Sequence, residues 1–124
     1  MNKVCLTGNL VRDIEYRQTP NGNGVVSNCI AVQRDRKEAD GSYATDFINF
    51  VAWNHHADYL SKYALKGDKL ELVGRLQIRK FQDKNDNTQS VTEVIVESIQ
   101  AIPTAKREVE IPPEEIDEED DLPF

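Results

Sequence analysis

The first hundred residues alternate apolar and polar side chains, which is the pattern of β-strands with one buried face. Alternating or β-branched runs, separated by Gly, Pro, Asn and Asp, predict strands over 3–8, 24–33, 43–53, 68–81 and 88–102. The turn sequences PNGNG at 20–24 and DKNDN at 83–87 separate two pairs of these runs. Pro103 ends the last strand, so the pattern predicts an ordered domain over 1–102.

Residues 55–65 (HHADYLSKYAL) have a different period. Their apolar side chains recur at Tyr59, Leu60, Tyr63 and Ala64, which is the spacing of one helix face. The Lys-Gly pair at 66–67 is typical of a helix C-terminus. We therefore predict one helix between the third and fourth strands, and expect both tyrosines to pack it against the strands.

Gly74 interrupts the fourth strand, and a glycine inside a strand indicates a bulge or a bend. Five strands, one helix after the third and a bent long strand are the layout of an OB-fold barrel. The predicted fold class is therefore all-β, a five-stranded OB-fold barrel with one helix between strands 3 and 4. The alternative is an unclosed five-stranded sandwich, which would leave long strand edges exposed.

The charge of the chain is divided unevenly. Its net charge is −7, but nine of its 22 acidic residues lie within 108–124, a segment without Lys or Arg. Residues 1–107 therefore hold 15 basic and 13 acidic side chains, a charge of +2. The acidic pI of the chain belongs to its tail and does not argue against nucleic-acid binding. Because residues 103–124 are acidic, rich in proline and poor in apolar residues, we predict a disordered acidic C-terminal tail.

Several kinds of site are disfavoured. Cys5 and Cys29 alone supply neither a zinc framework nor a disulfide scaffold, so we expect both to be reduced and buried in strands. His55 and His56 have no third ligand at suitable spacing and no nucleophile nearby. We therefore predict no metal site, no cofactor and no catalytic residue.

The cellular location is also predicted from what the chain does not contain. The sequence has no run of 18 apolar residues and opens without a secretory signal pattern. We expect a cytoplasmic protein that does not associate with membranes.

The chain resembles the bacterial and phage single-stranded DNA-binding proteins. The motifs that match are NKVCLTGNLVRD at 2–13, TPNG at 19–22, TDFINFVAW at 45–53, KG at 66–67, GRLQIRKF at 74–81, TEV at 92–94 and the terminal DDLPF at 120–124. The resemblance implies an OB-fold protein that wraps single-stranded DNA, most often as a homotetramer, and that is not an enzyme. It also implies a location at the nucleoid, or in the host cytoplasm if the chain is phage-encoded, and a tip that recruits replication, recombination and repair proteins.

The resemblance places base-stacking positions at Phe47, Trp53 and Phe81. Unpaired bases stack on any aromatic ring, so exposed rings suit binding without sequence preference. From composition alone, Phe47 and Trp53 are better interpreted as core residues, whereas Phe81 lies in the charged segment RKFQDK, where burial is unfavourable. Phe50 falls on the opposite face of its strand from Phe47, so we assign it to the core.

Cations for phosphate contact lie close to these rings in the sequence. The candidates are Arg34, Arg36, Lys66, Arg79 and Lys80. Arg79 and Lys80 are neighbours on a strand and must point to opposite faces, so at least one can be simply a solvated charge. Lys66 is equally consistent with a phosphate contact and with a place at the negative end of the helix dipole. Arg36 stands where many relatives have an aromatic residue.

The last five residues, Asp120, Asp121, Leu122, Pro123 and Phe124, form the predicted partner-binding tip. A terminal Phe offers a pocket both a ring and a carboxylate, which a solubilising segment does not need. The segment before it, 103–119, is short for this family. The second hypothesis for its function is an OB-type adaptor or RNA-binding module, and the third is an enzyme. Phage or cellular origin, dimer or tetramer, and site size stay open.

Overall fold

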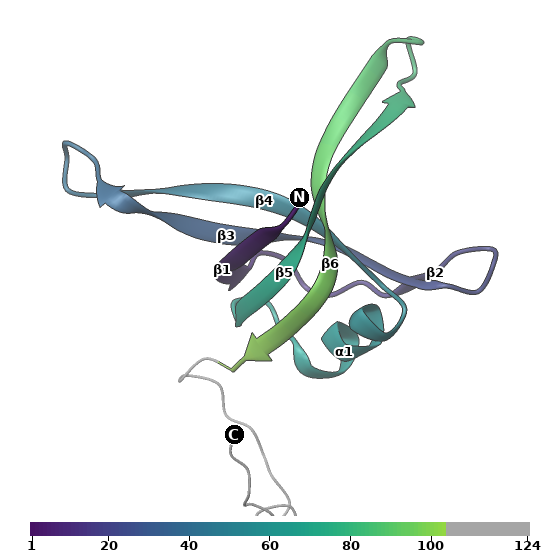
Figure 1. Ribbon diagram of the computed structural model, residues 1–124, viewed down its shortest axis with the longest axis horizontal. Helices are drawn as coiled ribbons and strands as arrows, with labels where there is room; N and C mark the ends of the chain where they lie inside the picture. The colour runs from purple at the N-terminus through teal and green to yellow at the C-terminus, as the bar shows by residue number, and fades with distance from the viewer. Residues whose placement is uncertain (104–124) are drawn as a thin grey trace, which may run out of the picture.

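The computed structural model of the chain describes residues 1–103, and the predicted acidic tail beyond them, with its tip at 120–124, lies outside the described residues. The elements are β1 (Val4–Leu10), β2 (Arg17–Gln18), β3 (Gly24–Lys37), β4 (Tyr43–Trp53), α1 (His55–Tyr63), β5 (Lys69–Gln82) and β6 (Thr88–Ile102). Figure 1 shows two long hairpins, β3–β4 and β5–β6, projecting in different directions from a central body.

Five of these strands close into a barrel. The sheet order is β1-β5-β6-β4-β3-β2, and β1 also pairs with β3 through Asn9 opposite Ala31 and Leu10 opposite Ile30. This last pairing joins the two sides of the sheet, so the five-stranded OB-fold barrel is confirmed and the open sandwich is excluded. The pairing of β4 with β6 is parallel, whereas the other pairings are antiparallel.

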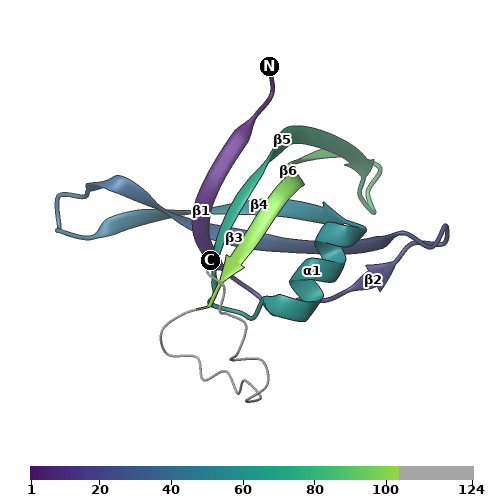
Figure 2. The ribbon, with the colours of Figure 1, turned by 60° about the horizontal axis from the view of Figure 1, so that its bottom comes forward.

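The barrel interior is filled by inward-facing residues of its strands and by α1, which lies against one end of the barrel in Figure 2. The largest fully buried apolar side chains are Phe50, Ile30, Leu60, Leu70, Leu72, Val26 and Val94. Phe50 is therefore in the core, as predicted. Tyr59 packs against this core, and its hydroxyl accepts a hydrogen bond from the Ala101 backbone N–H at 3.0 Å. Tyr63 is exposed, so the prediction that it packs α1 against the strands is wrong, and its ring contacts the Tyr59 ring at a centroid distance of 5.1 Å.

The irregularity predicted at Gly74 is present, but the extra residue lies in the opposite strand. Val73 pairs with Ser98 and Gly74 with Val96, so Glu97 of β6 is left without a partner in the ladder. A Cβ at Gly74 would stand 2.2 Å from the Ile95 carbonyl oxygen. Only glycine fits this close approach, and the bulge bends the β5–β6 pair away from the barrel.

Three further local predictions need correction. The helix ends at Tyr63, and Gly67, with a φ of 91°, belongs to the turn in which the Asp68 N–H donates to the Leu65 carbonyl. Cys29 is buried and its burial raises the pKa of the thiol, whereas Cys5 is exposed because β1 presents it outward. The two-residue strand β2 was not predicted, since it is too short to show an alternating pattern.

Within residues 1–103, no helix has the length and apolar character needed to cross a lipid bilayer. In the same part of the chain, no three His, Cys, Asp or Glu side chains gather where they could bind a metal ion.

Candidate nucleic-acid interface

One face of β4 displays two of the three predicted stacking rings. Phe47 is 66% exposed and Trp53 38% exposed, six residues apart on the same side of the strand. At about 3.4 Å per residue, the two positions are separated by roughly 20 Å along β4. Both rings therefore face solvent, so the core interpretation drawn from composition is wrong for them.

A shallow hollow of about 250 Å³ runs beside Trp53 across four strands. Its lining residues are Val25 and Ser27 of β3, Val51 and Trp53 of β4, Gln77 and Arg79 of β5, and Glu93 and Ile95 of β6. We call this hollow the Trp53 groove. Each strand contributes two residues that are two positions apart, because alternate side chains of a strand point to the same face. The strand register therefore brings one aromatic ring and one cation together in an open groove.

Phe81 lies farther along β5 and is 41% exposed. Two residues before it on the same side of the strand, the Arg79 guanidinium carbon stands 5.8 Å from the centre of the Phe81 ring. Arg79 also donates from Nε to the Oε1 of Glu93 at 3.0 Å. Arg79 therefore links the Trp53 groove to Phe81, but its Nε is already bonded to the Glu93 carboxylate.

Arg34 is also paired. Its Nε and Nη2 donate to the two carboxylate oxygens of Asp46 at 3.0 and 2.9 Å, a two-bonded fork between β3 and β4. The hydrogen bonds from Arg34 hold the pKa of the Asp46 carboxyl below its ordinary value. Asp46 neutralises much of the charge that Arg34 could offer to a phosphate.

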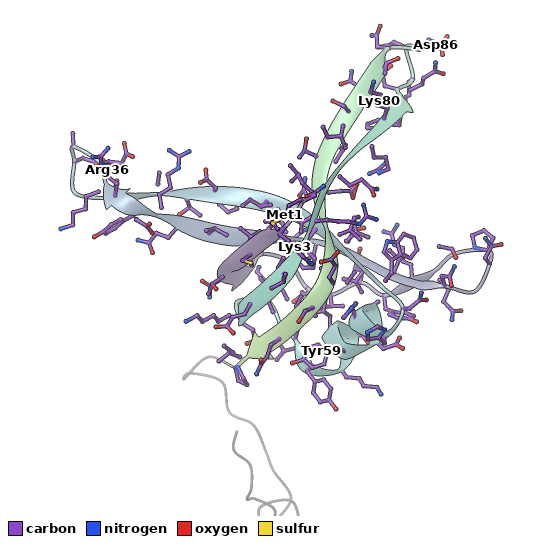
Figure 3. All side chains as sticks on the ribbon, in the orientation of Figure 1. Met1, Lys3, Arg36, Tyr59, Lys80 and Asp86 are labelled. Carbon is purple, nitrogen blue, oxygen red and sulfur yellow. The ribbon has the colours of Figure 1, made fainter. Side chains whose placement is uncertain are left out.

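The other predicted cations are spread over the surface, as Figure 3 shows for two of them. Arg36 lies on the β3–β4 hairpin, and Lys80 lies on the β5–β6 hairpin, on the opposite face of β5 from Arg79. Lys66 lies in the Leu65–Asp68 turn, which is bonded to β1 through the Gly67 N–H and the Leu10 carbonyl at 2.9 Å. Lys62, and not Lys66, is the cation in the last turn of α1.

A second hollow, of about 300 Å³, adjoins the Trp53 groove and shares two of its lining residues. It is lined by Arg12, Glu15, Arg17, Val25 and Ser27, and we call it the Arg12–Arg17 pocket. Sequence reasoning did not select either arginine, because they lie between two predicted strands without an apolar pattern. The signal would have been two arginines five positions apart immediately before the turn sequence at 20–24.

The comparisons with known proteins point to one family. Residues 1–102 match the model of the single-strand binding protein family. The "Single-stranded DNA-binding protein" of Oceanobacillus iheyensis is 40% identical over 104 residues, which cover 84% of this chain and 65% of that protein. "Single-stranded DNA-binding protein 1" of Lactococcus lactis is 38% identical over 86% of this chain and 71% of that protein. The protein of the same description in Streptococcus pyogenes is 38% identical over 82% and 78%. The chain thus spans about two thirds of the length of the first of these relatives.

Proposed function

Because this chain belongs to the single-strand binding protein family, we propose that it binds single-stranded DNA without sequence preference, coating and protecting it during replication, recombination and repair. The observation that most supports this is the exposure of Phe47 and Trp53 on β4 and of Phe81 on β5, with Arg79 of β5 next to both Trp53 and Phe81. Exposed rings are a cost in water unless a ligand covers them, and unpaired bases stack on them with little dependence on sequence.

Duplex DNA keeps its bases stacked on one another, so it cannot use these rings. The first test is a titration of the full chain with labelled oligo(dT), a duplex of equal length and the corresponding RNA, at several salt concentrations. We expect oligo(dT) to be strongly preferred to duplex, with log affinity falling linearly with log salt as phosphates are neutralised. Equal affinity for duplex and single strand would contradict the proposal, and preference for RNA would favour the RNA-binding alternative.

The proposal extends to self-association, most often as a tetramer in this family. Met1, Leu76 and Ile78 are exposed apolar residues that line a hollow of about 510 Å³ together with Val4 and the polar Asn2 and Lys3. In addition, β1 pairs with β3 only at Asn9 and Leu10. An apolar patch beside a sparsely paired strand edge supports an interface between copies of the chain. Sedimentation of the parent chain and of Ile78→Asp tests this, and a monomeric parent would overturn it.

We also propose that the tip at 120–124 recruits replication, recombination and repair proteins, and that the protein acts in the cytoplasm at the nucleoid. The sequence supports the first point, since Leu122, Pro123 and Phe124 add apolar surface after a run of acidic residues. Carboxylates suit a basic rim on a partner, and the terminal ring suits a pocket.

A further inference from the structure

The strand register places an arginine in line with the groove tryptophan. Trp53 of β4 pairs with Val25 of β3, and Val25 pairs on its other side with Arg17 of β2. Residues directly opposite in antiparallel strands point to the same face. At about 4.8 Å per strand, Arg17 is therefore roughly 10 Å from Trp53 across the sheet.

The second arginine of the pocket is held in place by a buried side chain. Asn28, only 2% exposed, accepts a hydrogen bond from the Arg12 N–H at 3.3 Å and donates to the Arg12 carbonyl at 3.0 Å. These two bonds fix the backbone of Arg12 against β3. The Arg12 side chain is exposed at the mouth of the pocket.

The charges of these arginines are more available than those of Arg34 and Arg79, two of the predicted phosphate ligands. Within residues 1–103, no carboxylate forms an ion pair with Arg12, whereas Arg34 and Arg79 are bonded to Asp46 and Glu93. Arg17 pairs with Glu15 at 3.4 Å, but both side chains are 76% exposed. An exposed ion pair of this kind contributes little to stability, so a phosphate can replace Glu15 as the partner of Arg17.

We infer that the Arg12–Arg17 pocket is a second phosphate-binding site, which receives the DNA backbone where the strand leaves the Trp53 groove. This rests on the proposed binding of single-stranded DNA. The pocket and the groove share Val25 and Ser27, so the two hollows are adjacent and a strand stacked on Trp53 can continue into the pocket. Guanidinium groups bind phosphate oxygens through two parallel hydrogen bonds, so arginine suits this role.

The test compares Arg12→Gln and Arg17→Gln with Lys62→Gln in the full chain. Lys62 is exposed on α1, so the control removes the same charge away from both hollows. The probe is oligo(dT), and Trp53 fluorescence reports occupancy of the groove. Each lost phosphate contact should make the negative slope of log affinity against log salt shallower by about 0.7. This corresponds to about fivefold weaker binding at 0.1 M salt. The quenching of Trp53 at saturation should stay unchanged.

A fourth variant should strengthen oligo(dT) binding instead of weakening it. Glu15→Gln removes the carboxylate beside Arg17, so it should tighten oligo(dT) binding. If Arg12→Gln and Arg17→Gln bind as Lys62→Gln does while the parent chain binds normally, the pocket inference is wrong and the proposed function stands. If oligo(dT) neither binds the parent chain nor quenches Trp53, both are wrong.

Discussion

Arg79 and Glu93 form an ion pair between β5 and β6 in which only the arginine meets solvent, since the two side chains are 55% and 5% exposed. Both residues line the Trp53 groove, and the Arg79 guanidinium also lies beside the Phe81 ring. Arg79 therefore has a structural role in addition to any contact with DNA.

We expect Arg79→Ala to destabilise the fold by about 1–3 kcal/mol, because it leaves a buried carboxylate without its charged donor. Urea unfolding measures this, with Arg75→Ala as the control, since Arg75 is exposed on the same strand and its side-chain hydrogen bond within residues 1–103 is to Gln77. Adding Glu93→Gln to Arg79→Ala should restore part of the stability. An Arg79→Ala chain that unfolds at the same urea concentration as the parent would remove the structural role.

Phe81→Ala should weaken binding to oligo(dT) by about 1–3 kcal/mol per subunit while leaving the unfolding midpoint nearly unchanged, because the ring is exposed and is predicted to stack on a base. Binding is followed by quenching of Trp53, the single tryptophan of the chain. Phe50→Ala is the contrast, since this core ring should cost about 3–5 kcal/mol of stability. Normal binding by Phe81→Ala would show that its ring is not a stacking platform.

The Arg34–Asp46 fork makes a prediction about pH. The pKa of Asp46 is lower in the folded chain than in the unfolded chain, so the fork stabilises the fold above the unfolded pKa, and this contribution is lost as the pH falls through the lowered folded pKa. In Arg34→Gln, an NMR titration should show the Asp46 pKa rising toward its ordinary value. Asp40 is the internal control, because Ser42 lowers its pKa and is unaffected by this change. An unchanged Asp46 pKa would mean that Arg34 is not the cause.

Gly74→Ala should destabilise the chain by about 1–3 kcal/mol, because the new Cβ meets the fixed carbonyl oxygen of Ile95. Gly24→Ala is the informative comparison, since its Cβ would meet the tip of the Tyr16 side chain, which can rotate aside. Thermal unfolding of both variants should rank Gly74→Ala as the less stable. The reverse order would show that the β5–β6 bulge can absorb a methyl group.

Removing Phe124 alone should abolish recruitment of replication and repair proteins while barely changing DNA binding, because it takes away the ring without removing an acidic side chain. Deleting 120–124 should likewise abolish recruitment and should leave oligo(dT) binding intact or slightly tighter, most visibly at low salt. If 103–119 is the flexible segment that the sequence predicts, its 17 residues would span roughly 20–25 Å, enough to reach the binding face. A pull-down from cell extract measures recruitment. Partners that still bind without Phe124 would mean that the tail only solubilises the chain.

Much of the fold is determined by local sequence. Alternation sets the face of each residue within a strand, and so Phe47 and Phe50 are assigned correctly to opposite sides of β4. The glycine in the fourth predicted strand likewise marks the bulge, because close backbone approach excludes a Cβ wherever it occurs. The alternation depends on neighbours in the chain, which a sequence pattern records, whereas the glycine marks a close approach whose partner, Ile95, lies on another strand.

Only the tertiary structure decides which cations are available and which stand next to one another. Arg34 and Arg79 are neutralised by carboxylates 12 and 14 positions away, and no local pattern shows such a pairing. Strand register alone sets Arg17 in line with Trp53, through a two-residue strand too short to have a period. Electrostatic pairing depends on distance in space, and the closure of the barrel brings together side chains that the sequence separates.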